Sequence, residues 1–345
     1  MPRAHVLTCA YAPRMRLVDG FGRVATDLRV SLTDRCNLRC TYCMPAEGLP
    51  WLPSDTLLTD DELVRVVRVA VDLGVEDVRF TGGEPLLRPR LPEIVRGIAS
   101  HPSGPKTSVT TNGIGLGKMA QALKDAGLHR VNVSLDTLDP ERFKELTRRN
   151  RIDDVLRGLE AAADAGLLPV KVNAVLMRGV NDAEAVDLLA FCLERGYELR
   201  FIEQMPLDAQ HAWNREEMIA ADEILDLLGK EFTVVPDEEP RGSQPAERFR
   251  VLKDGVDLGT VGIIGSVTRP FCGACDRVRL TADGMVRNCL FARDEHDVRS
   301  VVRGGGSDDD IAAVFLGAMA VKKAGHGIDD PSFVQPDRPM SAIGG

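Results

Sequence analysis

Cysteine is the residue type most able to carry chemistry in this chain of 345 residues, which contains eight of them. Six fall into two triads, the first with C-x3-C-x2-C spacing and the second with C-x2-C-x13-C spacing. Closely spaced cysteines in a chain without an export signal indicate metal binding or redox chemistry rather than disulfide bonds. The first triad is Cys36, Cys40 and Cys43, and the second, more than 200 residues later, is Cys272, Cys275 and Cys289.

Each triad offers three thiolates rather than four. A closed zinc site takes four ligands, and an iron–sulfur cluster whose irons are all held by protein takes four cysteines. Two triads therefore predict two clusters, each with one iron open to a small molecule. Zinc completed by histidine is the alternative, and His296 could serve the second triad. We expect the other cysteines, Cys9 and Cys192, to lie in a terminal tail and in a helix core.

A glycine pair follows the second predicted strand, in the motif TGGEP at residues 81–85. Glycine has no Cβ, so a ligand can approach its backbone closely. An ordinary tight turn before Pro85 is the alternative. The motif lies one strand after the first cysteine triad, and this combination favours a cofactor site.

Basic residues occur at positions where a strand side chain would be buried. Arg277 and Arg279 alternate on a predicted strand, so both face one side, as a triphosphate site requires. A pair of solvated surface arginines is the alternative. Arg29, Arg79 and Lys171 lie within other predicted strands, where an unpaired charge is costly. A buried salt bridge is the alternative for each of these three.

Short β-branched runs alternate with longer helical patterns, which predicts parallel strands joined by helical crossovers. About six such units are too few for a closed eight-stranded barrel, so the predicted fold is α/β, a partial and open parallel βα barrel. Thr59 and Glu62 form a capping box before the first helix, and Asn181 is predicted to cap a later one. The predicted strands are Asp27–Ser31, Asp77–Phe80, Thr107–Thr111, Arg130–Leu135, Val170–Val175 and Glu198–Glu203.

Near residue 230 the pattern changes from alternating strands and helices to short strands with tight turns. We therefore expect a barrel over residues 1–230 and a second region over residues 231–345. The second region is β-rich, carries the second triad and is predicted to close the open side of the barrel. Residues 304–310 are predicted to form a solvated loop, followed by a helix from Asp310 to about Ala324.

The net charge of −9 argues against nucleic-acid and anionic-membrane partners, and no apolar run reaches the ~18–20 residues of a membrane span. The amino-terminal residues lack a signal-peptide pattern, so the expected location is the cytoplasm.

The first triad and the TGGEP motif together resemble the radical S-adenosylmethionine superfamily. The second triad with its R-x-R, and the runs TTNG, NVSLD, VKVNAV and LRFIEQMP, resemble the GTP 3′,8-cyclases of molybdenum cofactor biosynthesis over nearly the whole chain. That resemblance implies a lyase that cyclises GTP to 3′,8-cyclo-7,8-dihydro-GTP through a 5′-deoxyadenosyl radical. It implies two [4Fe–4S] clusters on the two triads and S-adenosyl-L-methionine as cofactor.

The same resemblance implies contacts and partners. S-adenosylmethionine would contact Tyr42, Gly83, Ser134 and Met205, and no catalytic side chain is predicted. An electron donor of the reduced flavodoxin or ferredoxin type and hand-over of product to a cyclic pyranopterin monophosphate synthase are expected, and a homodimer is allowed. GTP would contact Arg29, Arg79, Thr110, Lys171, Arg277 and Arg279, with Arg200 a weaker candidate.

Two other functions fit parts of the pattern. A peptide-modifying radical enzyme would normally carry more carboxy-terminal cysteines, and a zinc-stapled binding module would leave the TGGEP motif unexplained. The chain ends in Gly344 and Gly345, and a poorly ordered tail is the usual expectation for such an end. Two residues without side chains make a narrow tail, and the resemblance implies that they enter the open end of the barrel without touching the clusters.

Overall fold

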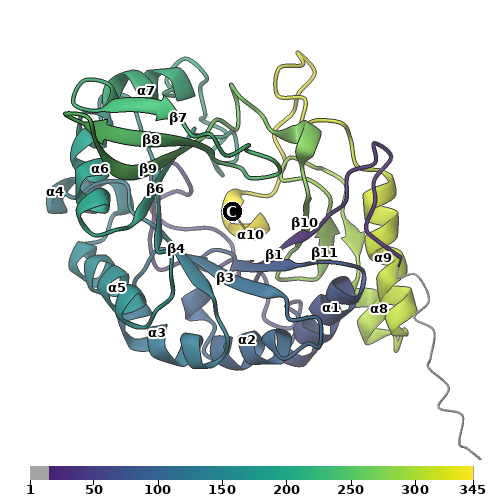
Figure 1. The fold of residues 1–345 in the computed structure, drawn as a ribbon. Coiled ribbons are helices and arrows are strands. Elements are labelled where there is room, and N and C mark those ends of the chain that lie inside the picture. Colours follow the sequence, from purple (N-terminus) through teal and green to yellow (C-terminus); the bar gives the residue numbers. More distant parts are fainter. Residues whose placement is uncertain (1–14, 345) are drawn as a thin grey trace, which may run out of the picture.

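The computed structural model describes residues 15–344, and the strands in this part of the chain join one 12-stranded sheet that helices wrap on the outside (Figure 1). The strand order is β12-β11-β10-β1-β2-β3-β4-β5-β6-β9-β8-β7. The strands are β1 (Asp27–Ser31), β2 (Asp77–Thr81), β3 (Lys106–Thr111), β4 (Arg130–Ser134), β5 (Lys171–Val175), β6 (Glu198–Ile202), β7 (Thr233–Pro236), β8 (Glu247–Lys253), β9 (Val256–Ile264), β10 (Arg277–Leu280), β11 (Met285–Arg287) and β12 (His296–Asp297).

Strands β1 to β6 are parallel neighbours, each connected to the next by at least one helix, so the predicted α/β fold is confirmed. β12 and β7 lie at opposite edges, and the sheet remains an open barrel. The helices are α1 (Asp60–Asp72), α2 (Leu91–Ala99), α3 (Leu116–Asp125), α4 (Pro140–Thr147), α5 (Ile152–Asp164), α6 (Ala185–Glu194), α7 (Ala221–Leu228), α8 (Arg299–Arg303), α9 (Asp308–Ala320) and α10 (Met340–Ile343), with 3-10 turns at Pro85–Leu87, Asp182–Glu184 and Cys272–Ala274.

Alternation along the strands separates an apolar outer face from a polar inner face. The outward side chains pack under the helices, where Val78, Phe80, Val131 and Phe201 are fully buried. The inward positions carry arginine, threonine, serine and asparagine instead. The hydrophobic core therefore lies between sheet and helices, and the inside of the barrel is left for polar ligands. Inward residues that line a cavity are Arg29, Arg79, Thr110, Ser134, Asn173, Arg200, Arg277 and Arg279.

The carboxy-terminal residues extend the sheet at both edges. β10 pairs in parallel with β1, and β9 pairs in parallel with β6. The short helix α10 then lies in the middle of the open barrel (Figure 1). The opening is thus narrowed by strands added to the same sheet and by the end of the chain.

The helix boundaries confirm some predictions and correct others. The capping box of α1 is present, with the Glu62 amide donating to Thr59 Oγ1 at 3.2 Å. Asn181 does not cap its helix, because its side chain binds the carbonyls of Asp136 and Val175 and the amide of Met177. The predicted loop is present at residues 304–307, but the helix after it, α9, is capped by Ser307, begins at Asp308 rather than Asp310 and ends at Ala320 rather than near Ala324.

No helix within residues 15–344 has both the length and the apolar character needed to cross a bilayer.

Candidate functional site

The first triad lies in the loop after β1 and lines a cavity of about 170 Å³. The Leu38 amide lies 3.4 Å from Cys36 Sγ, and the Asn112 side-chain amide lies 3.8 Å from the same sulfur. Neutral N–H groups therefore point at this sulfur. Ser341, in α10, lines the same cavity. The cavity is lined by Cys36, Cys40, Cys43, Gly82, Gly83, Thr111, Asn112, Phe143, Thr147 and Ser341, among others.

Burial and nearby carboxylates disfavour free thiolates in this cavity. Burial raises the pKa of Cys36 to about 11, and Glu84 adds to the rise. Burial raises the pKa of Cys43 to about 12, with Cys36 and Asp208 contributing. Burial also raises the pKa of Cys40, and Asp136 is the next cause. Positive charge from bound iron would offset these costs, so the donor set is suited to an iron–sulfur cluster.

The glycine pair of the TGGEP motif is needed for a different close approach from the one predicted. A Cβ on Gly82 would lie 2.3 Å from the Thr33 carbonyl oxygen, and one on Gly83 would lie 2.3 Å from that of Arg35. The Gly83 amide donates to the Thr33 carbonyl at 2.7 Å. The glycines thus let the cysteine loop pack directly on the strand end. Gly83 also lines the cavity of the first triad.

The Glu84 carboxylate of the TGGEP motif is held by three hydrogen bonds. It accepts from the Thr111 hydroxyl and the Asn112 amide, each at 2.7 Å, and from the Leu86 amide at 2.9 Å. Burial raises the pKa of Glu84 to about 7, against the effect of these hydrogen bonds. These hydrogen bonds join the ends of β2 and β3 beside the first cavity, which Thr111 and Asn112 line.

The second triad lines a separate cavity of about 380 Å³. Cys272 lies in a 3-10 turn and Cys289 follows β11, and both belong to the carboxy-terminal region. Two cations hold this turn: Arg23 Nη1 donates to the Cys272 carbonyl at 2.6 Å, and Lys322 Nζ lies 3.6 Å from Cys275 Sγ. The predicted alternative ligand His296 does not line the cavity; His326 does, with Nε2 3.1 Å from the Ser266 carbonyl.

The spacing of the cysteines in both triads is compatible with clusters. In a [4Fe–4S] cluster each cysteine binds its own iron, so the three sulfurs need not meet at one point. In the described residues, no group of three or more His, Cys, Asp or Glu side chains is arranged to hold a single metal ion. The cysteines of both triads within residues 15–344 are free thiols.

A third cavity, of about 240 Å³, lies inside the barrel. Its wall includes Cys43 of the first triad, and Phe271 and Leu290, which are sequence neighbours of the second triad. Tyr42, Ser134 and Met340 line both this cavity and that of the first triad. Predicted site residues from distant strands are therefore brought together here: Arg29, Tyr42, Arg79, Thr110, Ser134, Met205, Arg277 and Arg279.

The arginines of this barrel cavity have too few carboxylate partners. Asp27 Oδ2 lies 3.8 Å from Arg79 Nη2 and 3.9 Å from Arg277 Nε. Burial lowers the pKa of Arg29 well below its usual value, and the charge of Arg79 adds to this effect. Within the described chain, the buried Nε atoms of Arg29, Arg79, Arg200 and Arg277 have no hydrogen-bond partner. Buried positive charge that is only partly compensated is costly, so an anionic ligand would stabilise this wall.

Two of the basic candidates are placed differently from each other. Lys171 does not line the cavity, and its ammonium pairs with Glu198 at 2.8 Å. Arg200, the weaker candidate, does line it and donates to Asn132 at 3.0 Å. Burial lowers the pKa of Arg200 to about 9, and Arg79 contributes.

The end of the chain reaches the same cavity. Arg279 donates to the Gly344 carbonyl, and Ile343 is fully buried. The predicted entry of the tail is thus seen for Gly344, whereas Gly345 lies outside the described residues. Ser341, three residues before Gly344, lines the cavity of the first triad, whereas Gly344 is not among the residues that line it.

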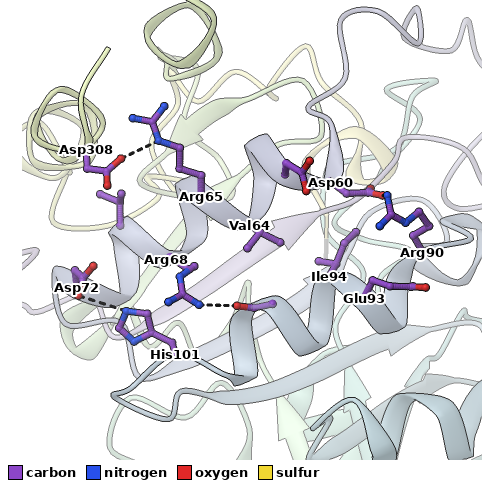
Figure 2. Close-up of a pocket in the computed structure, with 13 residues that line it drawn as sticks. Asp60, Val64, Arg65, Arg68, Asp72, Arg90, Glu93, Ile94, His101 and Asp308 are labelled. Atoms are coloured by element: carbon purple, nitrogen blue, oxygen red, sulfur yellow. Dashed lines mark hydrogen bonds and ion pairs between the residues drawn. The ribbon is translucent and has the colours of Figure 1, made fainter. Parts of the chain in front are cut away.

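A broader hollow of about 550 Å³ lies between α1 and α2 (Figure 2) and contains no cysteine. Arg65 pairs with Asp308 at 2.8 Å, and His101 Nε2 lies 3.4 Å from Asp72. Its charged side chains largely partner one another, so this hollow lacks the uncompensated charge that marks the barrel cavity.

Sequence reasoning missed Asp136 and Asn173 in the barrel cavity. The Tyr42 hydroxyl donates to Asp136 Oδ2 at 2.7 Å, and the Val175 amide donates to Oδ1 at 2.9 Å. Burial raises the pKa of Asp136 to about 6. A polar residue at the carboxyl end of a parallel strand is the signal that could have found Asp136, since such ends carry the chemistry in α/β folds.

Comparison with known proteins gives a consistent result. The Radical SAM superfamily matches residues 30–192, and the family Molybdenum Cofactor Synthesis C matches residues 197–328. A GTP 3′,8-cyclase of Streptomyces coelicolor is 64% identical over 331 residues, covering 95% of this chain and 96% of that protein. One from Mycolicibacterium smegmatis is 59% identical over 333 residues, covering 95% and 92%. Among solved structures, Streptococcus suis SuiB bound to S-adenosylmethionine has a TM-score of 0.56 at 14% identity, covering 80% of this chain and 62% of that one, which is a likeness of fold alone.

Proposed function

Because the chain belongs to the GTP 3′,8-cyclase family of radical S-adenosylmethionine enzymes in molybdenum cofactor synthesis, we propose that GTP is cyclised in the barrel cavity between its two cysteine triads. The family reaction yields 3′,8-cyclo-7,8-dihydro-GTP. The observation that supports this location is the set of buried arginines in the cavity wall whose Nε atoms have no hydrogen-bond partner among the described residues and which share few carboxylates, as suits binding of a triphosphate. A nucleotide there would lie between the two triads.

The first triad is the site proposed for the cluster that works with S-adenosylmethionine. Cys36, Cys40 and Cys43 would hold one [4Fe–4S] cluster, and the fourth iron would be open to the methionine part of the cofactor. Cluster and cofactor together supply a radical that removes a hydrogen atom from the nucleotide. Gly83, Tyr42, Ser134 and Met205 are the proposed cofactor contacts, and the first three line the wall of the first cavity.

The Tyr42 side chain is fixed in the cavity wall by a hydrogen bond even without a bound ligand. Its hydroxyl is bound to Asp136, which is bound in turn to the backbone of β5. The ring therefore cannot swing into the cavity without breaking a buried hydrogen bond. The chain thus presents a preformed wall to the cofactor, which lowers the ordering cost of binding.

The second triad is proposed to hold a second [4Fe–4S] cluster whose open iron faces the substrate. Cys272, Cys275 and Cys289 would be its ligands. Arg277 and Arg279 lie in β10, shortly after Cys275 in the chain, and both line the barrel cavity. A triphosphate bound to them would therefore lie close to this cluster. Arg29, Arg79 and Thr110 complete the proposed GTP site, and Arg200 joins them because it lines the same wall. Lys171 is retained as a contact at the edge of the site, reached by exchange of its Glu198 partner.

The two regions divide the work. Residues 1–230 carry the first triad and the cofactor contacts, and residues 231–345 carry the second triad and the tail. Proposed partners are an electron donor of the reduced flavodoxin or ferredoxin type and a downstream cyclic pyranopterin monophosphate synthase. The cytoplasm is the proposed location, and a homodimer is the proposed assembly.

One experiment tests the whole proposal. The protein is incubated anaerobically with S-adenosylmethionine, GTP and a strong reductant, and the nucleotide product is analysed by mass spectrometry. We expect a product with the mass of GTP, because cyclisation rearranges the nucleotide without adding atoms, but with a changed retention time and ultraviolet spectrum. A Cys36→Ser protein is the control and should form none. Recovery of unchanged GTP from protein that carries both clusters would contradict the proposal.

A further inference from the structure

The side chain of Lys322 is buried at the end of α9, beside the second triad. The residue is only 5% exposed, although lysine is almost never fully buried without a partner. No described carboxylate pairs with it in the salt bridges of the structure. Its burial therefore needs another explanation.

All three N–H donors of the Lys322 ammonium group have acceptors in the segment Cys275–Arg277. Lys322 Nζ lies 2.8 Å from the Arg277 carbonyl, 3.4 Å from the Cys275 carbonyl and 3.6 Å from Cys275 Sγ. An ammonium has three N–H donors, and these are three acceptors. The charge is thus held against one sulfur of the triad and against the strand that carries Arg277.

Other charged groups lie around the second triad, including the half-buried carboxylate of Asp276, which pairs with Arg277 at 3.6 Å. Arg23 donates to the carbonyls of Cys272, Lys323 and Ala324, which holds the far side of the same turn. Arg279 lowers the pKa of Cys289, although burial dominates and raises it. The carboxylates Asp294 and Asp330, on the rim of the cavity, are exposed to solvent, where their charges are screened.

Among residues 15–344, no ammonium group is hydrogen-bonded to a sulfur of the first triad. Cys36 Sγ instead receives neutral N–H groups from Leu38 and Asn112. The Arg39 guanidinium donates to the Cys36 carbonyl rather than to the sulfur.

We propose that Lys322 is a positioning residue that holds the second triad in shape and raises the reduction potential of the cluster bound there. This inference rests on the proposed second cluster. Adding an electron to a cluster is easier next to a positive charge and a donor to its sulfur, and harder next to carboxylates.

The test is a redox titration of the reconstituted full chain, followed by electron paramagnetic resonance. Lys322→Met removes the charge and keeps the length of the side chain. We expect the oxidised-to-reduced equilibrium of the second cluster to change by about tenfold, equal to about 59 mV downward for a one-electron couple. The first cluster should be unaffected. A Cys36→Ser, Cys40→Ser, Cys43→Ser background gives the potential of the second cluster alone.

Three further variants decide the interpretation. Lys323→Met changes the exposed neighbour and should leave the potential as in the parent. Lys322→Arg keeps the positive charge, so the reduction potential of the second cluster should stay close to that of the parent protein. If the Met variant assembles too little cluster, Lys322→Gln keeps a donor without the charge, and its potential should again be lowered.

The outcomes separate this inference from the function on which it depends. A second cluster of unchanged potential in Lys322→Met and Lys322→Gln would overturn the role of Lys322 and leave the proposed function intact. A parent protein that binds the iron of a single cluster, with the second triad intact, would overturn both.

Discussion

The two cysteine triads have the same number of ligands but opposite surroundings. The first lies in a loop between a parallel strand and a helix, and carboxylates act on its buried thiols. The second lies in a short turn where Gly273 and Ala274 are exposed, and cations hold its carbonyls and a sulfur. A negative setting favours a cluster that gives up an electron readily, and a positive setting favours one that receives an anionic substrate. Ligand count alone would have made the two sites equivalent.

The loss of one cysteine should separate the two triads most strongly. We expect Cys40→Ser to reduce cleavage of S-adenosylmethionine to background, with or without GTP, because the first cluster would be lost. The formation of 5′-deoxyadenosine under anaerobic reduction measures this. Cleavage at the parent rate would show that the first triad does not hold the cofactor-cleaving cluster.

Loss of one cysteine from the second triad should leave the first cluster in place and abolish cyclisation of GTP. We expect Cys275→Ser to keep the iron of the first cluster while cyclisation of GTP falls to background, since the substrate-side cluster is missing. Iron content and nucleotide product are measured on the same preparation. Normal binding and cyclisation of GTP would make the second triad a structural feature only.

Charge in the barrel cavity should matter next. We expect Arg277→Ala to weaken GTP binding by roughly 1.5–3 kcal/mol, about 10- to 150-fold, because a charge-assisted hydrogen bond to phosphate is lost. Guanosine serves as the control ligand, since it lacks the triphosphate. Calorimetry with both ligands should show the larger loss for GTP, and equal losses would indicate that the arginine acts on folding alone.

The tail links the two triads, so a change there should have an intermediate effect. Gly344 has φ 84°, and a Cβ there would lie 2.5 Å from Thr81 Cγ2. We expect Gly344→Ala to displace the tail from Arg279 and to lower the rate of cyclisation about tenfold, equal to about 1.4 kcal/mol. Iron content should stay near normal.

A matched control separates backbone strain from steric overlap in the tail. Gly305 has φ 79°, and a Cβ there meets nothing within 4 Å. Gly305→Ala should lower the melting temperature slightly and leave cyclisation unchanged. Equal loss of activity in both variants would mean that the position of Gly344 has no special importance.

The smallest effect is expected where the tail is fastened to the second region. Arg338 binds Asp283 through two hydrogen bonds, at 2.8 and 3.0 Å, and also pairs with Glu295. We expect Arg338→Ala to lower the free energy of unfolding by about 1–2 kcal/mol, allowing for its partial exposure. Arg215→Ala removes an exposed pair with Asp329 and should cost less.

The pH dependence of that effect has a definite sign. Burial alone would raise the pKa of Asp283, but hydrogen bonds from Arg338 and Thr281 outweigh it and lower the pKa below its usual value. The contribution to stability is therefore present above about pH 4 and is lost as the pH falls through the lowered pKa. Denaturant titrations at neutral and acidic pH should show the Arg338→Ala deficit shrinking in acid, and a constant deficit would contradict this linkage.

Local patterns made much of the fold predictable. The predicted strand at Asp27–Ser31 has the bounds of β1, and the other five predicted parallel strands differ from theirs by one residue at an end. Asn181 was misread because the same side chain that caps helices also binds loop carbonyls, and only packing decides which. The start of the helix after residue 304 was predicted two residues late, because Ser307 is a helix cap within a glycine-rich, acidic run.

The sequence by itself determined the two triads, the alternation of arginines with apolar residues along the strands, and the parallel βα order, because each depends on neighbours within one loop or one period of a strand. Only the tertiary structure decided that Lys171 pairs with Glu198 while Asn173 lines the cavity, and that Tyr42 is held by Asp136. It also placed Lys322 on Cys275 and Ser341 in the cavity of the first triad. These contacts join residues tens to hundreds of positions apart, and they follow from strand register and from where the chain's end packs, which no local spacing encodes.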